Sequence, residues 1–575
     1  MSYKIFDFLT LDVLGGVDAN LAGTDVVTSK YSPYGGDGSS RSPSTSMYIQ
    51  NSNILTFHKV LGTIHDLTLT GVYEQSKGYY DGMSVGGGLL YPDLQYYNLQ
   101  SNVGVTASSS YSMSALQSWV GRINYILMNK YLFTATYRAD GSSKYPNNHW
   151  GYFPSFALDW RASEESFIKN LNLFSNLKFR GSWGVTGNQA VDPFATIPKM
   201  VAGTYGYGKP VANVIFYDID NHLADPNLKW EETRQTDLGA DMGFLKNRLT
   251  ITIDYFSKKT KDLLMNEPIP YYQGGITNGS SNIGYLTKNV GSVENKGIEF
   301  MITGVPVDTK DINWNINFNL SSYKNKVTDL GKEKFVEVGV GDIVGSGINL
   351  SRVIVGEPLG TFYGYKFLGI YQESEASEAA LFGLHPGDSK YLDLNGDHEI
   401  TSDDQVVIGH ALPTYTWGLD NTLRYKNLEL NMFIQAVHGN DVLDLDYAAS
   451  TSGVGGNSRT ITSADVTSWT PENKSNMWPK RPSASNTEYS NSSKLVQDGS
   501  YVRVKNLSLS YRIPDNIIKG VPVKIMFSAQ NLVTFTKYKG FDPEASSSNN
   551  DLSAGIVMGA YPSSRTYIFT LQFSL

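Results

Sequence analysis

The segment Ile312-Asn313-Trp314-Asn315-Ile316-Asn317-Phe318-Asn319-Leu320 alternates apolar side chains with asparagine. In an extended strand this period places the apolar side chains on one face and the asparagines on the other. A strand of about nine to eleven residues with one apolar and one polar face is typical of a transmembrane β-barrel, whose wall meets lipid on one side and water on the other. The end of the chain repeats the pattern, with Tyr567, Phe569, Leu571, Phe573 and Leu575 set against Thr566, Thr570, Gln572 and Ser574.

The composition agrees with a barrel wall. Of 575 residues, 41% are hydrophobic and only 18% are charged, against roughly 25% charged in average soluble proteins, and the chain holds 55 glycines and 37 tyrosines. The sequence has no apolar run long enough for a membrane-spanning helix. Barrel strands spread their hydrophobicity over alternate positions, so low hydropathy does not argue against them.

Charge and cysteine content exclude several other classes. The net charge of −8 provides no basic stripe for nucleic acid. The absence of cysteine excludes a disulfide framework, a thiolate metal site and a cysteine nucleophile. The eight histidines are scattered, without a metal-binding helix pair, and no nucleophile elbow is present. The sequence therefore predicts no enzyme.

Strand-like stretches recur at hairpin spacing, and they predict an all-β, antiparallel transmembrane barrel wall of about seventeen strands. The links Asn129-Lys130, Lys246-Asn247 and Lys426-Asn427 are predicted tight turns. The expected strands are 3–14, 46–58, 62–74, 114–128, 130–138, 155–162, 177–185, 234–243, 248–256, 292–304, 311–322, 361–371, 415–424, 427–436, 502–512, 522–530 and 566–575.

Long connections rich in Gly, Ser, Asn and Tyr predict long extracellular loops at 75–112, 187–229, 258–290, 372–413 and 438–500. These loops carry paired tyrosines, whose flat rings stack on sugars or pack on peptides. Tyrosines also anchor loops and form interfacial girdles, so that alternative stays open. The candidate ligand contacts are Tyr79, Tyr80, Tyr96, Tyr97, Tyr271 and Tyr272.

An acidic segment at 388–404 resembles an EF-hand-type calcium loop, because a hard cation needs several oxygen ligands folded around it. Counting from Asp393, oxygen donors stand at the first, third, fifth, ninth and twelfth positions, and the seventh supplies a backbone carbonyl. The candidate calcium ligands are Asp393, Asn395, Asp397, Glu399, Thr401 and Asp404. His398 stands where a glycine usually makes the turn, which predicts a strained, left-handed conformation and weaker binding. A solvated turn rich in Asp and Asn is the alternative.

A series of short motifs runs in order through nearly the whole chain. They are Arg138-Ala139-Asp140-Gly141-Ser142-Ser143-Lys144, Trp150-Gly151-Tyr152-Phe153-Pro154-Ser155, Glu164-Glu165-Ser166-Phe167, Arg180-Gly181-Ser182-Trp183-Gly184, Gly187-Asn188-Gln189, Asn227-Leu228-Lys229-Trp230-Glu231, Asn289-Val290-Gly291, Glu294-Asn295-Lys296-Gly297, Tyr391-Leu392-Asp393, Trp469-Thr470-Pro471-Glu472-Asn473, Asn531-Leu532-Val533-Thr534 and Phe541-Asp542-Pro543-Glu544. This ordered series resembles the SusC/RagA family of TonB-dependent outer-membrane transporters.

The resemblance implies import of an oligosaccharide or, as the second choice, a peptide across a Gram-negative outer membrane. It implies three further partners: a SusD-like surface lipoprotein, the lipid membrane, and the TonB-ExbB-ExbD motor acting through an N-terminal part. The family's barrel has twenty-two strands and a plug, whereas residues 1–575 resemble its C-terminal β-barrel portion, without signal peptide, TonB box, plug and first strands. We therefore expect a partial barrel that reaches the outer membrane when joined to, or assembled with, that part.

Two other classes stay open. A passive porin or structural outer-membrane barrel needs neither plug nor motor, but does not account for the motif series. A secreted all-β adhesin would carry Thr and Ser where this chain has Trp314 and Phe569. No cofactor is expected apart from a structural Ca²⁺.

Overall fold

The computed structural model describes residues 1–28, 37–89, 91, 93, 95–197, 200–203, 216–219, 222–268, 285–338, 350–446, 467–480, 491–514, 521–547 and 551–573. The chain divides into two compact units. The first comprises Met1–Arg161, Arg180–Thr236 and Thr260–Val290, and the second Ala162–Phe179, Asp237–Lys259 and Gly291–Leu575.

Helices are few and short. The α-helices are α1 (Ser166–Lys169) and α2 (Ala376–Leu381), and the 3-10 helices are η2 (Leu99–Ser101), η3 (Ala162–Glu164), η5 (Glu373–Glu375), η6 (Ser402–Asp404), η7 (Ser493–Leu495) and η8 (Asp551–Ser553). In the part of the chain that the structure describes, no helix has the length and apolarity that a membrane crossing requires.

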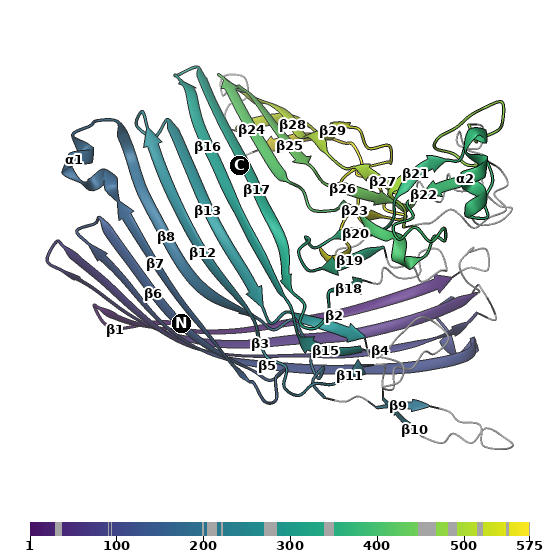
Figure 1. Ribbon diagram of the computed structural model, residues 1–575. Helices are drawn as coiled ribbons and strands as arrows, with labels where there is room; N and C mark the ends of the chain where they lie inside the picture. The colour runs from purple at the N-terminus through teal and green to yellow at the C-terminus, as the bar shows by residue number, and fades with distance from the viewer. Residues whose placement is uncertain are drawn as a thin grey trace. The chain divides into compact units, whose positions relative to one another are not determined.

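Long antiparallel strands dominate the first unit (Figure 1). Seven of them pair in chain order: β1 (Ser2–Phe6), β2 (Leu9–Thr28), β3 (Gly38–Leu61), β4 (His65–Gly88), β5 (Val103–Leu127), β6 (Tyr131–Ser142) and β7 (Trp150–Arg161). Three further strands of the main sheet, β8 (Phe174–Asn188), β12 (Glu231–Phe244) and β13 (Leu249–Lys261), are each divided between the two units. Shorter strands are β9 (Met200–Gly203) with β10 (Phe216–Ile219), and β11 (His222–Leu223) with β14 (Leu264–Pro268) and β15 (Tyr285–Asn289).

The second unit contains another antiparallel series and several small sheets. The series is β16 (Ser292–Asp308), β17 (Ile312–Asp329), β24 (Tyr415–Tyr425), β25 (Leu428–His438), β28 (Tyr501–Ile513), β29 (Val523–Thr536) and β31 (Thr566–Phe573). The small sheets are β18 (Phe335–Val338), β19 (Ser351–Ile354), β20 (Thr361–Tyr365) and β23 (Gln405–His410); β21 (Phe367–Ile370) and β22 (Ser389–Tyr391); and β26 (Asp441–Asp444), β27 (Val496–Asp498) and β30 (Ile556–Val557).

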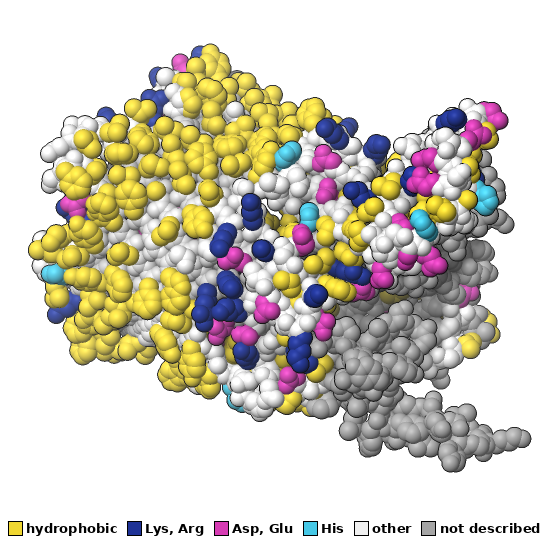
Figure 2. Space-filling model, in the orientation of Figure 1, with side chains coloured by type: hydrophobic (Ala, Val, Ile, Leu, Met, Phe, Trp, Pro, Cys, Tyr) yellow, Lys and Arg dark blue, Asp and Glu magenta, His cyan; other side chains and the backbone are white. Residues whose placement is uncertain are grey.

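Strand register turns the alternation of the sequence into two chemically different faces. One row of directly paired residues crosses six strands of the second unit and is wholly apolar: Trp314, Leu423, Leu430, Leu509, Phe527 and Phe569. The next row points to the opposite face and begins Asn315, Thr422, Asn431, Ser508 and Ser528. Figure 2 shows apolar side chains gathered in broad patches. Phe569 of the apolar row is 70% exposed. A wall with one apolar and one polar face is the arrangement that lipid requires.

The first unit has the same two faces. Phe57, Leu69, Ile123, Ala135 and Phe156 form an apolar row across β3 to β7, which defines the apolar face of these strands. The neighbouring row, Thr56, Thr70, Arg122, Thr136 and Ser155, defines their polar face.

The main sheet contains seventeen strands among the described residues, as expected, but two assignments were wrong. The predicted strand 3–14 is two strands, β1 and β2, because a turn at Asp7-Phe8 interrupts it. The predicted strand 361–371 forms β20 and β21 in small sheets. Thr361, Phe362 and Tyr365 are buried, so this run was apolar because it packs inside the loops and not because it faces lipid.

The predicted tight turns are confirmed. Asn129, Lys246 and Lys426 have φ values of 56°, 59° and 51°, which is the left-handed conformation that two-residue hairpin turns use.

The predicted loops hold more regular structure than expected. The range 75–112 was wrong as a loop, because β4 continues to Gly88 and β5 begins at Val103. This part of the sequence is rich in Ser, Gly and Tyr, and it lacks the apolar alternation that marks lipid-facing strands. The backbone ladder nevertheless continues through it, since every strand hydrogen-bonds to a neighbour. The range 372–413 likewise contains α2, β22 and β23.

Segments of several loops in the second unit share a small apolar core, which we call the loop core. It consists of Leu350, Phe362, Ala411, Leu443, Leu445, Leu495 and Ile556, all at most 8% exposed. Two hydrogen bonds reinforce it, from the Leu443 backbone N–H to the Gly555 carbonyl (2.9 Å) and from Ser351 Oγ to the Leu552 carbonyl (2.6 Å). The loops of this unit are therefore packed together as a folded body.

Candidate functional site

In the first unit the motifs spaced along the sequence meet in one cluster. Its apolar part, the first motif cluster, consists of Tyr145, Phe153, Val185, Val191, Leu228 and Trp230, all at most 8% exposed. The Phe153 and Trp230 rings pack edge to face, with centroids 5.5 Å apart. The motif glycines permit this packing, because a Cβ at Gly187 would stand 2.1 Å from Phe153 Cζ. The glycine of the Gly187-Asn188-Gln189 motif is thus required so that the Phe153 ring can pack closely against the backbone.

Polar contacts tie the same motifs together. Trp230 Nε1 donates to the His149 carbonyl at 3.1 Å. Glu231, only 7% exposed, accepts from Asn188 Nδ2 at 2.9 Å and from the Leu264 backbone N–H at 2.8 Å. The sequence motifs of this unit are accordingly positioning elements that hold loop segments to strands.

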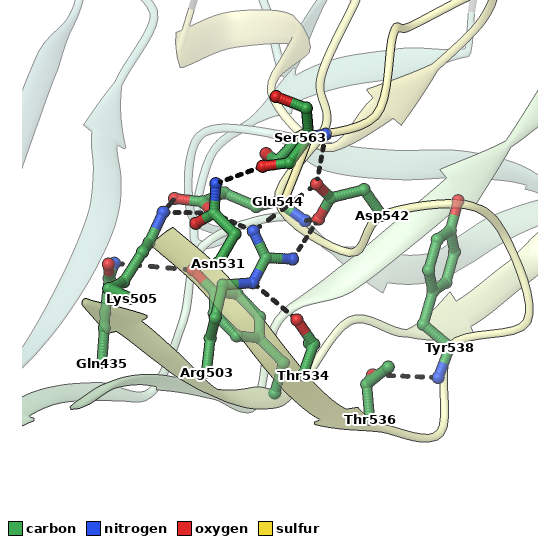
Figure 3. A network of polar contacts seen from close by, with 12 residues as sticks. Gln435, Arg503, Lys505, Asn531, Thr534, Thr536, Tyr538, Asp542, Glu544 and Ser563 are labelled. Atoms are coloured by element: carbon green, nitrogen blue, oxygen red, sulfur yellow. Dashed lines mark hydrogen bonds and ion pairs between the residues drawn. The ribbon is translucent and has the colours of Figure 1, made fainter. Parts of the chain in front are cut away.

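In the second unit a buried arginine organises the last two motifs (Figure 3). Arg503 of β28 is 3% exposed and forms an ion pair with Asp542, which is 4% exposed. Its Nη1 reaches Glu544 Oε2 at 2.7 Å and its Nε donates to Thr534 Oγ1 at 2.8 Å. Lys505 Nζ binds the same Glu544 at 2.7 Å. The motifs at 531–534 and 541–544 are therefore two sides of one ion network.

The network shifts proton affinities near it. Burial would raise the pKa of Asp542, but the Arg503 guanidinium and the backbone N–H groups of Glu544 and Ser563 outweigh it and lower that pKa to about 2. The Tyr538 hydroxyl donates to Asp444 at 2.7 Å, and burial together with this carboxylate raises the tyrosine pKa. Asp542 is consequently ionised at every physiological pH.

Sequence reasoning missed Arg503. A single arginine in a strand has no spacing signal, and its carboxylate partners lie 39 and 41 residues further along the chain. The Asp542-Pro543-Glu544 pair gave no local sign of burial, so nothing in the sequence indicated that it requires a cation.

The Trp469-Thr470-Pro471-Glu472-Asn473 motif borders a polar cavity of about 640 Å³ in the second unit. Trp469 Nε1 donates to Gln372 Oε1 at 2.9 Å, and the cavity is lined by residues including Gln372, Glu375, Lys390 and Asn476. Burial would lower the pKa of Lys390, but its hydrogen bonds to Glu378 and Glu375 outweigh burial and raise it. The cavity thus carries a fixed ion cluster on the folded loops.

The acidic segment adopts a tight loop ending in η6. The predicted left-handed conformation of His398 is confirmed, with φ at 65°. Asp393 accepts backbone N–H bonds from Gly396 (2.7 Å) and His398 (3.0 Å), and buried Asp404 accepts from Leu394 and Thr401, both at 2.8 Å. Burial would raise the pKa of Asp393, but the backbone N–H groups of His398 and Gly396 hold it below its ordinary value.

In this conformation the loop carboxylates point to backbone amides. Across the described ranges, no three acidic or histidine side chains come close enough together to hold a metal ion. The donor types fit Ca²⁺, but Asn395, Asp397 and Glu399 would have to turn toward Asp393 and Asp404. Calcium binding here stays a prediction.

The candidate tyrosines lie in different settings. Tyr79 and Tyr80 are adjacent in β4, so they point to opposite faces: Tyr79 Oη donates to Met47 Sδ on the apolar face, and Tyr80 lies on the polar face with Ser46 and Ser112. The rings of Tyr96 and Tyr97 contact each other at a tilt of 37°, with centroids 4.5 Å apart. Tyr271 and Tyr272 lie outside the described residues.

Comparison with known proteins agrees with this architecture. A family model described as TonB dependent receptor-like, beta-barrel, matches residues 6–532. TonB-dependent receptor P3 of Formosa agariphila is 36% identical over 539 residues, which cover 91% of this chain and 52% of that protein. TonB-dependent receptor SusC of Bacteroides thetaiotaomicron is 32% identical over 477 residues, covering 80% of this chain and 44% of that protein.

A solved structure, the RagAB peptide transporter, superposes with a TM-score of 0.81 at 22% identity, covering 100% of this chain and 60% of its own. That likeness supports the fold. The two-faced wall and the motif clusters define an outer-membrane β-barrel protein. The chain belongs to the TonB-dependent receptor β-barrel family, and within it to the SusC/RagA type. It spans about half the length of the curated relatives that it matches.

Proposed function

We propose that this chain forms the barrel portion of an outer-membrane importer of oligosaccharides. The observation that carries the proposal is the polar face of the strands, where the row Asn315, Thr422, Asn431 and Ser508 presents amides and hydroxyls, and the neighbouring Asp420 is hydrogen-bonded to Thr422 and Asn431. A neutral, hydrogen-bonding surface suits an uncharged polar cargo better than a charged one. Peptide cargo is the second choice, and a passive porin is the alternative that requires no motor.

The proposal assigns the folded loops a second task. A SusD-like lipoprotein lid needs a rigid surface on which to close, and the folded loops, which contain the loop core and the cavity at Gln372 and Lys390, supply one. The TonB-ExbB-ExbD motor would act through a plug, while this chain contributes wall, loops and docking surface. No bond is made or broken in this mechanism, so the protein is a transporter and not an enzyme.

Uptake by intact cells tests the proposal. Cells lacking the protein should lose import of particular oligosaccharides, and removing TonB should abolish the same import. Uptake that persists without TonB would identify a passive pore. If cells lacking the protein lose peptide uptake but keep normal oligosaccharide uptake, the cargo is peptide and not oligosaccharide.

A further inference from the structure

Two adjoining cavities lie on the polar face of strands β2 to β5. The first, of about 410 Å³, is lined by residues including Asp18, Asn20, Tyr48 and Tyr80. The second, of about 260 Å³, is lined mainly by serines and shares Tyr80. These strands are 20 to 25 residues long, about twice what a bilayer crossing requires. The cavities lie in the serine-rich extensions beyond the apolar row.

The two tyrosine rings rest on glycine backbone. A Cβ at Gly82 would meet Tyr80 Oη at 2.5 Å and Cζ at 2.9 Å, so the ring lies directly over that glycine. A Cβ at Gly78 would meet Tyr48 Cδ2 at 3.5 Å. The strand partners are Tyr48 with Gly78 and Ser46 with Tyr80, which makes the tyrosines diagonal neighbours roughly 7–8 Å apart. Tyr48 and Tyr80 stay 45% and 40% exposed.

Polar groups beside the rings are available to a ligand. Among the described residues, no side-chain hydrogen bond or ion pair engages Asp18, Asn20, Ser46 or Ser112. Asp18 pairs across the strands with Tyr48, and Asn20 with Ser46, so carboxylate, amide and hydroxyl groups border the rings on the same face. Among the lining residues that the structure describes, Asp18 is the only charged one in the first cavity, and the second has none.

We infer that this surface, the tyrosine platform of Tyr48 and Tyr80 with Asp18 and Asn20, binds a neutral oligosaccharide. The inference rests on the proposed import function and locates one of its binding sites. Aromatic rings take the apolar faces of pyranose rings, while the carboxylate, amide and hydroxyl groups take sugar hydroxyls, which both donate and accept. The absence of lining Lys or Arg in the described cavities disfavours acidic polysaccharides.

A peptide fits this surface less well. Peptides bind sheets chiefly by adding a strand to an open edge. Here β3 and β4 are paired on both sides, so their backbone groups are already engaged. The platform therefore offers side chains alone, and these have the chemistry of sugar recognition.

Binding measurements on the full-length protein, purified from its own outer membranes in detergent, test the inference. The probes are maltohexaose, cellohexaose, mannohexaose and xylohexaose, titrated by calorimetry. Tyr80→Ala and Tyr48→Ala should each weaken binding of the recognised hexasaccharide by roughly tenfold, which is the loss expected for a stacking ring. Tyr111→Ala, on the opposite face of β5 and lining neither cavity, is the matched control and should bind as the wild type does.

A gentler pair of variants separates ring position from folding. Gly82→Ala displaces the Tyr80 ring and should weaken binding, whereas Gly71→Ala, in the same strand but lining neither cavity and with nothing within 4 Å of its Cβ, should not. Unchanged binding in Tyr80→Ala and Tyr48→Ala would overturn the platform while TonB-dependent uptake, and so the proposed function, still stands. A wild-type protein that binds none of the four probes also overturns it. Import of peptides alone would instead refute the proposed function.

Discussion

Removing the guanidinium of Arg503 should destabilise the barrel more than any nearby surface change. Arg503→Ala leaves the carboxylate of Asp542 buried, because that residue is only 4% exposed and no longer has its cation. Truncating one partner of a buried ion pair costs about 3–5 kcal/mol. Glu544 softens the loss, since it is 33% exposed and keeps Lys505. We therefore expect a loss of about 3 kcal/mol in the free energy of unfolding.

The assay is urea unfolding of the protein refolded into lipid vesicles, followed by tryptophan fluorescence. Lys505→Ala is the matched control, because Lys505 binds the same Glu544 from a more exposed position and should cost no more than about 1 kcal/mol. Arg503→Lys should recover only part of the loss, since an ammonium cannot copy the guanidinium fork. Equal small losses in Arg503→Ala and Lys505→Ala would refute the view that this network is a buried, mutually dependent unit.

Three further predictions follow from other contacts. The low folded pKa of Asp542, about 2 against an ordinary 3.8, stabilises the fold by about 2 kcal/mol above pH 4. Unfolding curves between pH 5 and pH 2 should show that stability falling, and Asp542→Asn should flatten the dependence. Gly187→Ala should cost about 1–3 kcal/mol because its Cβ meets Phe153, whereas Gly71→Ala, with nothing within 4 Å, should change stability by less than about 0.5 kcal/mol. If the acidic loop binds Ca²⁺, His398→Gly should tighten binding by relieving the positive φ, and a melting temperature indifferent to Ca²⁺ and chelator in both proteins would exclude the site.

Part of this fold could be predicted because strands that face lipid must carry apolar side chains on one face. Residues 312–320 and 566–573 alternate because one side must be apolar, and both are strands in the structure. The extensions of β4 and β5 between residues 75 and 112 were missed because their sequence, rich in Ser, Gly and Tyr, carries no regular alternation of apolar and polar residues. The run 361–371 was wrongly predicted to be a barrel strand. It is apolar because residues such as Phe362 pack in the loop core.

The candidate site residues could likewise be predicted only in part. Motif residues such as Trp230 and Asp542 could be singled out by resemblance, but their role could not, because it depends on partners tens of residues away. Tyr80 was predicted as a ligand contact because of its aromatic ring. That Tyr79 and Tyr80 point to opposite faces could be inferred only once both were known to lie in a strand. Tyr48 was missed because it sits in a predicted strand, where an aromatic residue attracts no notice.

The loop core constrains how this protein can diversify. Leu350, Phe362, Leu443 and Ile556 come from separate connections yet share one interior. A change in one connection is felt by the others, so loops cannot be exchanged one at a time as in an antibody. New specificities should arise in the side chains that the loop core holds at the surface, or by replacement of the whole set together.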